Sequence, residues 1–395
     1  MEHPQVRETD PAVADALAGE VRRQQDTLAM IASENHVSEA VLEAQGSALT
    51  NKYAEGYPGE RYYAGCEHAD EVEQLAVERA KELWGADHVN VQPHSGTQAN
   101  MAVYLAVLDP GDRILSLELE HGGHLSHGHP ANFTGQLFDV EQYRVDPETG
   151  YIDYEALAAR AESFDPDIVV SGFSAYPREV EWDRIQAAAD AVDAYHLSDI
   201  AHITGLVAAG VHDSPVGVAD FVTGSTHKTI RAGRGGIVMC DEEYADDVDA
   251  AVFPGGQGGP LMHNVAGKAV GFEEALRPEF EAYARQVVDN AEALAASFAD
   301  NGFEVVSGGD AEDALADAGI VLNANTVPGE TRSPFDPSGI RAGTPALTTR
   351  GFDEAAHREV GDLIHRVVDN VDDDSVIAEV RERVDELTDE HPLYD

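Results

Sequence analysis

Between residues 168 and 240 the chain reads IVVSGF (168–173), YHLSDI (195–200), FVTG (221–224) and GIVMC (236–240), with helix-like stretches between these segments. A fifth strand-like segment, RILSLEL, covers 113–119. Several of the five are apolar without alternation, as parallel strands are when both faces of their sheet are buried. Strands that alternate with helices predict an α/β fold built on a mostly parallel sheet.

Helical patterns surround this region. Residues 72–83 and 101–108 carry apolar side chains at helical spacing. A stretch rich in Gly and Pro at 253–260 breaks the rhythm, and a long helical region from 263 to 300 follows it. A chain of 395 residues is longer than one hydrophobic core usually serves. We therefore predict an N-terminal arm (1–35), a large domain (36–272) and a smaller α+β C-terminal domain (273–395).

The charge balance is strongly acidic. Asp and Glu number 74 against 25 Lys and Arg, for a formal net charge of −49. Nucleic acid and anionic membrane surfaces would repel such a shell, so neither is expected as a partner. Only four of the 25 basic residues are lysines: Lys52, Lys81, Lys228 and Lys268. This pattern favours a protein from a salt-loving organism, where concentrated ions screen self-repulsion; the alternative is an acidic protein adapted to dilute buffer.

Targeting and redox signals are weak. Cys66 and Cys240 have no metal-ligand spacing and suggest no disulfide framework. Residues 1–10 lack the basic and apolar regions of a signal peptide. No apolar run reaches the roughly 18 residues of a membrane span. We expect a cytoplasmic protein.

Lys228 is the first candidate for chemistry, because it follows the strand-like segment 221–224 in a chain that has almost eliminated lysine. Arginine would serve a surface role here, but it stays protonated and cannot form a Schiff base. A desolvated lysine can lose its proton and condense with an aldehyde such as pyridoxal phosphate. The alternative is a chance surface lysine.

Such a cofactor makes three further demands. Its phosphate needs backbone donors at a helix N-terminus, and Ser95-Gly96-Thr97 lies between a strand-like segment and a helix. Its pyridine nitrogen needs a carboxylate, and Asp199 lies at a strand end. Its ring needs a flat cover, which His124 or His127 in the run HGGHLSHGH (121–129) could supply.

Each of these signals has an alternative. Ser-Gly-Thr before a helix is often only an N-cap, and an Asp near a strand end is often a turn residue. The histidine run also suggests a metal site, although no carboxylate or cysteine partner is placed by spacing. The four signals together favour the organic cofactor, so we predict no metal.

The chain closely resembles the serine hydroxymethyltransferase family over nearly its whole length, and several stretches of sequence carry this resemblance. The matching strings are ASEN (32–35), LTNKYAEGYPG (49–59), RYY (61–63), QPHSG (92–96), FSAY (173–176), THK (226–228), FPGGQGGPLMH (253–263) and SGIRAGTPA (338–346). The resemblance implies fold type I of the pyridoxal-phosphate enzymes, with the cofactor in the large domain. It also implies reversible transfer of the serine hydroxymethyl carbon to tetrahydrofolate, or a related reduced pterin, to give glycine.

The resemblance also implies roles for individual residues. Lys228 would carry the cofactor as a Schiff base, with His227 beside it to shape reaction preference. His124 would stack on the ring, while Asp199 and His202 would hold its nitrogen and phenolic oxygen. The remaining cofactor contacts implied are Ser95, Gly96, Thr97, Ser174 and Ser225, with Gly256 from a neighbouring subunit.

The substrate contacts and a homodimer are implied in the same way. Arg341, with Ser33, would clamp the amino-acid carboxylate. Glu55, buried against aromatic rings with a raised pKa, would handle protons with Tyr53 and Tyr63 in the active site of the partner subunit; the alternative for the tyrosines is interface packing. The folate contacts implied are Leu119, Gly123, Leu125, Ser333 and Phe335.

One departure from the family pattern stands out. After VVSGG (305–309) the family usually continues with a segment of roughly 20 residues that is absent here. Either the protein is truly shorter here, or the sequence omits a disordered or deleted stretch. A true loss would remove one strand of the small-domain sheet and expose edge hydrogen-bonding groups. It also motivates two alternatives to the transferase: an aldolase with the same cofactor that needs no folate, and a cofactor-binding homologue that has lost catalysis.

Overall fold

The computed structural model describes residues 3–146, 148–303, 311–330, 332 and 337–394. The chain forms two compact units, one made of Val37–Ala284 and the other of Met1–His36 together with Arg285–Asp395. The first 36 residues thus belong to the same unit as the C-terminal segment. The division at 35/36 and 272/273 expected from the sequence stays a prediction.

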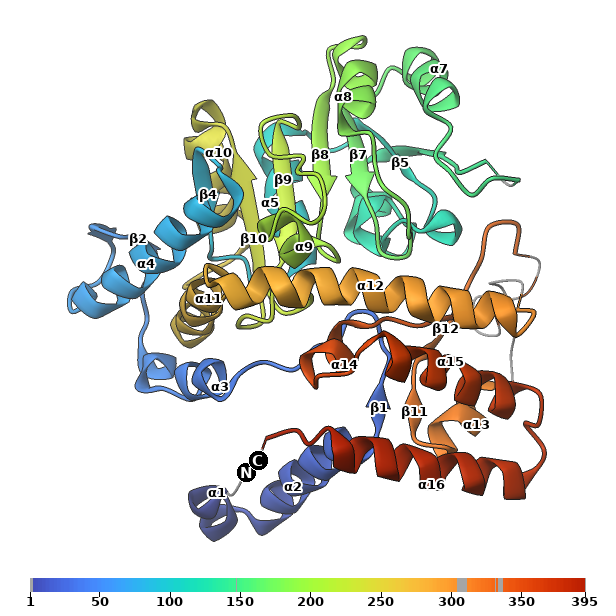
Figure 1. Cartoon of the computed structure of the whole chain (residues 1–395). Helices are drawn as coiled ribbons and strands as arrows, with labels where there is room; N and C mark the ends of the chain where they lie inside the picture. Colours follow the sequence, from blue (N-terminus) through green and yellow to red (C-terminus); the bar gives the residue numbers. More distant parts are fainter. Residues whose placement is uncertain (1–2, 147, 304–310, 331, 333–336, 395) are drawn as a thin grey trace. The chain divides into compact units, whose positions relative to one another are not determined.

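The unit 37–284 is built on a seven-stranded sheet (Figure 1). Its strands, in spatial order, are β4 (His88–Asn90), β10 (Gly236–Cys240), β9 (Phe221–Ser225), β8 (Tyr195–Asp199), β7 (Ile168–Gly172), β5 (Arg113–Leu117) and β6 (Asp139–Tyr143). The strands from β9 to β6 are parallel to their neighbours, whereas β10 runs antiparallel to both β9 and β4. The predicted α/β fold with a mostly parallel sheet is confirmed.

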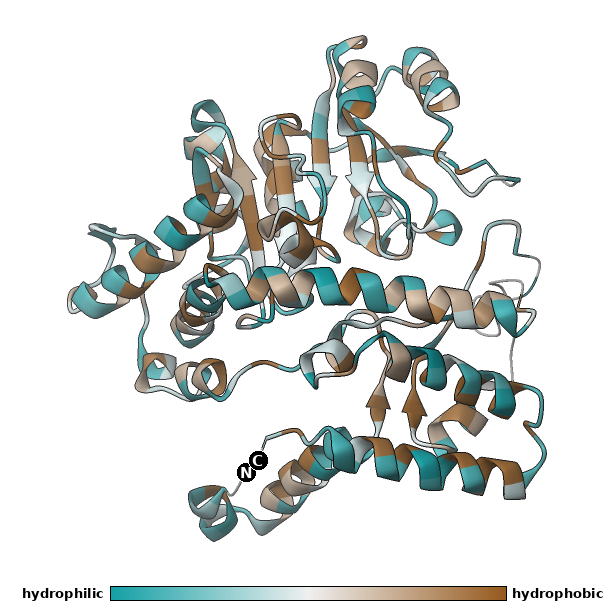
Figure 2. Ribbon diagram, in the orientation of Figure 1, coloured by the Kyte–Doolittle hydropathy of each residue, from teal (hydrophilic) through white to brown (hydrophobic). Residues whose placement is uncertain are grey.

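Apolar side chains on both faces hold this sheet between helices, and the strands are coloured largely as hydrophobic in Figure 2. On one face Val103 and Tyr104 of α5 (Gly96–Val107) form a buried cluster with Phe221 of β9. On the other, Trp84 of α4 (Glu67–Trp84) donates a hydrogen bond to the Thr204 carbonyl and packs edge-on against Phe272 of α11 (Met262–Ala275). The sheet is therefore buried on both sides, as its continuous apolar strands require.

The other elements of this unit are short. They are α3 (Glu39–Gln45), η1 (Ala48–Asn51), β2 (Gly56–Tyr57), β3 (Glu60–Arg61), η2 (Leu119–His121), η3 (Leu125–His127), α6 (Phe133–Leu137), α7 (Tyr154–Phe164), α8 (Trp182–Asp190), α9 (Thr204–Ala208), η4 (Glu242–Tyr244), α10 (Ala245–Ala250) and η5 (Ala251–Gly256). The long helical region predicted at 263–300 is two helices, α11 and α12 (Pro278–Asp300), because Pro278 lacks the amide hydrogen to continue α11.

The second unit is a helical layer with two small sheets. Strand β1 (Leu28–Ala29) runs parallel to β11 (Ile320–Val321), and β12 (Asn323–Asn325) pairs antiparallel with β13 (Gly339–Arg341). Its helices are α1 (Pro4–Thr9), α2 (Pro11–Asp26), α13 (Ala311–Asp317), α14 (Pro345–Thr349), α15 (Glu354–Val368) and α16 (Asp374–Glu390), together with residues 285–300 of α12. Leu28, Ile320, Ile364 and Val384 belong to its buried core.

Arg350 joins the two ends of the chain within this unit. Its guanidinium is almost fully buried and donates to the carbonyl of Thr27 at 3.0 Å and to that of His391 at 2.8 Å. Because it supplies several donors in a fixed plane, one arginine satisfies carbonyls left over at the ends of both α2 and α16. The segment that carries Ser33 is thereby fixed to the C-terminal helix.

Across the described part of the chain, no helix combines the length and apolar character needed to cross a membrane.

Candidate active site

The candidate residues gather at one edge of the large sheet. Because β5, β7, β8 and β9 are parallel, their carboxyl ends meet at the same edge. The segments that leave these ends carry His124, Ser174, Asp199 and Lys228. Strand β4 also ends here, since it runs antiparallel to β10, and it leads into Ser95. The carboxyl edge of an open α/β sheet is where ligands bind.

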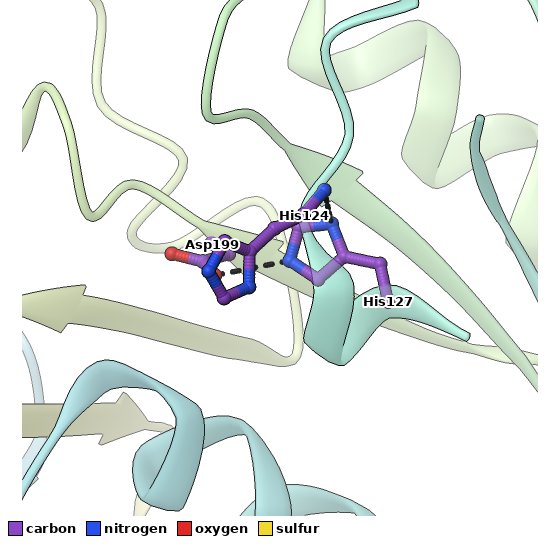
Figure 3. A group of neighbouring side chains, drawn as sticks. All are labelled: His124, His127 and Asp199. Carbon is purple, nitrogen blue, oxygen red and sulfur yellow. Dashed lines mark hydrogen bonds and ion pairs between the residues drawn. The ribbon is translucent and has the colours of Figure 1, made fainter. Parts of the chain in front are cut away.

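Asp199 is the most tightly held group at this edge. Its side chain is buried, and its Oδ2 accepts a hydrogen bond from His127 Nε2 at 3.0 Å (Figure 3). The same oxygen also accepts from Asn100 Nδ2 at 2.8 Å. Oδ1 accepts the amide hydrogen of Ala201 at 3.0 Å. Burial alone would raise the pKa of Asp199, but the hydrogen bond from His127 and the neighbouring histidines outweigh it, so that the pKa lies well below its usual range. Asp199 is therefore an ionised carboxylate.

The protons of His127 follow from its partners. The backbone amide of His124 donates to His127 Nδ1 at 3.3 Å, so this nitrogen is an acceptor. A neutral ring then carries its hydrogen on Nε2, the atom that faces Asp199. His127 is thus a donor to the carboxylate.

His124 is held by Ser126. The Ser126 amide donates to His124 Nδ1 at 3.2 Å, and the Ser126 hydroxyl lies 2.7 Å from the same nitrogen. The Ser126 hydroxyl in turn accepts from Asn100 Nδ2 at 2.9 Å, which leaves its own hydrogen for His124. These contacts fix the half-buried His124 ring beside Asp199, as Figure 3 shows.

Asn100 was not identified from the sequence, yet it joins these groups. It is fully buried on α5, and its Oδ1 accepts from Thr223 Oγ1 at 2.5 Å while its two amide hydrogens go to Ser126 and Asp199. The one available signal was a polar residue on a helix face otherwise made of Ala99, Ala102 and Val103. A buried amide with every hydrogen-bonding atom satisfied gives the site a single geometry.

The same three side chains bear on the metal-site alternative. Each of His124, His127 and Asp199 offers one potential metal-ligand atom, and these atoms lie within 4.8 Å of one another. The fold thus supplies the carboxylate partner that the sequence spacing did not. However, His127 Nε2 carries a hydrogen and Asp199 Oδ2 already accepts two. A metal would have to replace both hydrogen bonds, so the arrangement suits an organic cation at Asp199 better. The expected lack of a metal stays a prediction.

Ser95 and Ser225 form a small polar cradle. Ser95 is the N-cap of α5, and its hydroxyl accepts the amide hydrogen of Gln98 at 3.2 Å. Gly96 follows, and a Cβ there would lie 2.9 Å from Ser225 Oγ at the end of β9. Hydroxyls and amide groups at the start of a twelve-residue helix favour an anion such as a phosphate. Thr97, the second residue of α5, completes the predicted set.

Lys228 and His227 follow β9. Lys228 is half-buried, and the preceding Thr226 is fixed by hydrogen bonds to the carbonyls of Gly233 and Gly235. Burial, with the charges of Arg234 and Lys228, lowers the pKa of His227 to about 3, so this ring is neutral. Its Nδ1 is buried and has no hydrogen-bond partner among the described residues.

Ser174 and His202 also meet at this edge. Ser174 Oγ lies 3.5 Å from His202 Nε2, although 28 residues separate them. They follow β7 and β8, which are neighbours in the sheet. The pair therefore lies at the same edge of the sheet as Asp199, which ends β8.

Glu55, Tyr53 and Tyr63 form a separate cluster on the surface of the chain. Tyr63 donates to Glu55 Oε2 at 3.2 Å, and the two tyrosine rings meet edge to face at 5.6 Å. The hydrogen bonds to Glu55 raise the pKa of both tyrosines. Tyr53 and Tyr63 are 58% and 47% exposed, and Glu55 is half-buried. The burial expected for Glu55 is therefore not met within one chain.

The remaining candidates lie in loops and at short helices. Gly256 ends η5, where a Cβ would lie 3.0 Å from the Met101 side chain. Leu119 and Leu125 begin η2 and η3 on either side of His124, and Leu125 is 46% exposed. The Gly123 amide donates to the Glu118 carbonyl at 3.0 Å. Ser333 and Phe335 lie outside the described residues, as does the junction at 304–310 where the family segment is absent.

Ser33 and Arg341 belong to the other unit. Arg341 pairs with Asn323 across β12 and β13 and donates from Nε to Asn323 Oδ1 at 3.2 Å. Burial lowers the pKa of Arg341. The Gly343 amide donates to the Met30 carbonyl at 2.7 Å, which holds the segment after Arg341 against the segment that leads to Ser33. The two predicted carboxylate ligands thus lie on adjoining segments of one unit.

Comparisons with known proteins bear on what this site does. A family model described as serine hydroxymethyltransferase matches residues 6–364. The chain is 76% identical to a serine hydroxymethyltransferase of Halorubrum lacusprofundi and 74% identical to one of Haloarcula marismortui, in each case over all of both chains. A serine hydroxymethyltransferase of Halobacterium salinarum is 69% identical, again over all of both chains. These relatives come from salt-loving archaea, as the acidic composition suggested.

The same alignments bear on the absent segment. They run over 415 positions although this chain has 395 residues, so about 20 positions of these relatives have no counterpart here. The resemblance and fold type I are confirmed. With a family model over nearly the whole chain and relatives of this similarity, the chain belongs to the serine hydroxymethyltransferase family.

Proposed function

We propose that this chain is a pyridoxal-phosphate enzyme that reversibly transfers the hydroxymethyl carbon of serine to tetrahydrofolate or a related reduced pterin, giving glycine. The observation that carries the proposal is the state of Asp199: a buried, ionised carboxylate held by Asn100 and His127. It lies next to the strand that leads to Lys228, because Asp199 on β8 pairs with Thr223 on β9. A protonated pyridine nitrogen is the cation that such a carboxylate would pair with.

The residues present fit the cofactor. Oδ1 of Asp199 accepts one amide hydrogen and, with two lone pairs, can accept a second hydrogen from a ring nitrogen. Ser95, Gly96, Thr97 and Ser225 would hold the phosphate at the start of α5, where the lack of a Cβ on Gly96 lets the Ser225 hydroxyl lie close to the first turn of the helix. When bound, pyridoxal phosphate supplies an electron sink for the bond that breaks at the amino-acid α-carbon.

The protein's own groups hold and move protons. Lys228 would attach the cofactor, and the amino group of serine would take the place of the lysine amine when the substrate binds. His227 is neutral, so it adds no positive charge beside Lys228 that would disfavour a protonated Schiff base there. His127 keeps its hydrogen on Nε2 and so keeps Asp199 ionised through the reaction. His202, with Ser174, would donate to the phenolic oxygen, and His124 would cover the ring.

The amino acid and the pterin would each have contacts of their own. Arg341 and Ser33 would bind the serine carboxylate, for which a guanidinium is the matching bidentate donor. The pterin contacts that the family resemblance implies are Leu119, Gly123, Leu125, Ser333 and Phe335.

The exposed cluster of Glu55, Tyr53 and Tyr63 supports a homodimer with shared active sites. In one chain the two tyrosines expose about half of their surface, an arrangement suited to insertion into a second copy. Glu55 would act there as the proton donor and acceptor, and Gly256 would reach the phosphate of the partner's cofactor. The cytoplasmic location stays a prediction.

Serine turnover with and without tetrahydrofolate tests the proposal. Formation of glycine from serine that depends on the pterin is expected. Equal turnover without pterin would identify the folate-independent aldolase. Cofactor colour without exchange of the glycine α-proton would identify a homologue that has lost catalysis. The same assays at high salt and on a chain with the absent segment restored would show what that segment contributes.

A further inference from the structure

Lys268 is a fully buried lysine that the proposed reaction does not use. It lies on α11 with 1% of its surface exposed, in a chain that keeps only four lysines. Its Nζ donates to three backbone carbonyls, those of Val91 at 2.6 Å, Gly236 at 2.9 Å and Pro93 at 3.1 Å. Three backbone carbonyls that surround one ammonium group form a specific binding site for the Lys268 side chain rather than an incidental contact.

The three carbonyls define the state of the amine. A neutral amine has two hydrogens and would turn its lone pair toward the third carbonyl oxygen, whereas an ammonium group donates to all three. Burial lowers the pKa of Lys268 to about 7, opposed by the negative charge of Glu73. The three carbonyls further favour the protonated form of Lys268, because only the ammonium group has a hydrogen to donate to each of them.

Arginine could not take this place. A Cβ on Gly235 would already meet Cε and Nζ of Lys268, so the ammonium lies directly against the backbone. A planar guanidinium is larger and presents its donors in a fork instead of around a point. This explains why a chain that otherwise prefers arginine retains lysine here.

The carbonyls belong to segments that carry the cofactor site. Val91 and Pro93 follow β4 and lead to Ser95, while Gly236 begins β10 and its amide donates to the Pro93 carbonyl at 2.9 Å. The carbonyl of the adjoining Gly235 accepts from the Thr226 amide at 3.0 Å, two residues before Lys228. One ammonium therefore contacts the segment before the phosphate cradle and the segment that braces the Schiff-base lysine.

We propose that Lys268 is a positioning residue for the cofactor phosphate: it fixes the end of β4 to the start of β10 and so sets the geometry of Ser95-Gly96-Thr97. The inference rests on the proposed function, since it assumes that this cradle binds the phosphate of pyridoxal phosphate. Asp199 and His124, which would hold the ring, make no hydrogen bond to Lys268 among the described residues. Loss of Lys268 should therefore weaken binding of the phosphate more than binding of the ring.

The test compares pyridoxal phosphate with pyridoxal, which lacks the phosphate. Both are titrated at high salt into the cofactor-free forms of the parent and of Lys268→Met. We expect the variant to bind pyridoxal phosphate at least about 10-fold more weakly while its affinity for pyridoxal changes little, because carbonyls left without their donor no longer hold the cradle. The matched control is Lys81→Met on α4, whose Nζ donates a hydrogen bond to the Asp87 carbonyl and to no other group among the described residues, and which should bind both ligands as the parent does.

Gly235→Ala provides a second variant if Lys268→Met does not fold. Its Cβ would displace the Lys268 ammonium while leaving the charge in the protein, so the same selective loss is expected. Equal affinity of the parent and a folded variant for pyridoxal phosphate would overturn the inference and leave the proposed function standing. An equal loss for both ligands would also overturn it, since that is the mark of general destabilisation. A parent that binds neither ligand would overturn the proposed function, and this inference with it.

Discussion

His127 Nε2 lies 3.0 Å from Asp199 Oδ2, and both side chains are buried at the carboxyl edge of the sheet. They are 72 residues apart in the chain, and β8 and the loop after β5 bring them together. Because His127 Nδ1 accepts the His124 amide hydrogen, the shared hydrogen resides on the imidazole and the negative charge on the carboxylate. This assignment of charge determines what the site can bind.

Asp199→Asn should remove most of the activity. The amide keeps the size of the side chain but has no charge to hold a protonated pyridine nitrogen, so the cofactor loses its strength as an electron sink. We expect kcat to fall by about 100-fold or more, the scale of losing one preorganised electrostatic group. Steady-state serine turnover measures it, with Asp167→Asn, before β7 and at the opposite end of the sheet, as the control. Parent-like kcat in Asp199→Asn would show that the carboxylate has no part in the chemistry.

Arg341→Lys should weaken serine binding. An ammonium is a point donor and cannot form the two parallel hydrogen bonds of a guanidinium to a carboxylate. The loss expected is about 1.5–3 kcal/mol, or roughly 10- to 150-fold in kcat/KM. The surface pair of Arg184 with Glu155 supplies the control Arg184→Lys, for which kcat/KM should not change. An unchanged kcat/KM in Arg341→Lys would place the carboxylate elsewhere.

His196 should make the stability of the protein depend on pH. It is fully buried between Ser171 Oγ at 2.7 Å and Gln186 Oε1 at 2.9 Å, and burial lowers its pKa to about 3. Above the unfolded value of 6.5 the ring is neutral in both states, and the folded state keeps its full advantage. As the pH falls from 6.5 toward 3 the unfolded chain takes up a proton that the folded chain refuses, and stability falls by up to about 1.4 kcal/mol per pH unit.

Denaturant unfolding of the parent and of His196→Gln, at fixed high salt, measures this effect. The free energy of unfolding of the parent should exceed that of the variant by the largest amount above pH 6.5. This difference should shrink toward pH 3, because the variant has no ring to protonate. A margin that stays constant over this window would mean that His196 does not titrate on unfolding.

Shared active sites can be tested by mixing two inactive variants. Lys228→Ala lacks the attachment point, and Glu55→Gln should lose about 10²- to 10⁴-fold in kcat as a proton-transfer variant. If Glu55 acts in the partner's site, each hybrid dimer has one intact site, and an equal mixture should recover about one quarter of the parent's activity. If Glu55 acts within its own chain, no hybrid has an intact site and no activity returns.

The large sheet was largely predictable because its central strands are buried on both faces. Strands β7, β9 and β10 are short and largely apolar, and the observed bounds of these three and of β8 differ from the predicted ones by at most one residue. Strand β6 reads DVEQY and was missed, since at the edge of the sheet a strand keeps polar side chains. The meeting of Lys228 and Asp199 at one edge follows from the parallel order of β8 and β9 alone.

The supporting network could not be predicted in the same way. Asn100 reaches Asp199 across 99 residues and Thr223 across 123, and nothing in local spacing links them. The residues alone left open which histidine would cover the ring, and only the fold shows that His127 takes the carboxylate. Tyr53 and Tyr63 are exposed in one chain, as side chains meant for a partner's site or an interface would be, and their role in a second subunit stays a prediction.

We expect Lys228, and none of the other three lysines, to carry pyridoxal phosphate. Borohydride reduces a carbon–nitrogen double bond to a stable amine, so the purified yellow protein can be reduced, digested and analysed by peptide mass spectrometry. The predicted result is a phosphopyridoxyl group on Lys228 alone, and none in Lys228→Ala. A label on Lys52, Lys81 or Lys268, or no label in a folded protein supplied with the cofactor, would contradict the account.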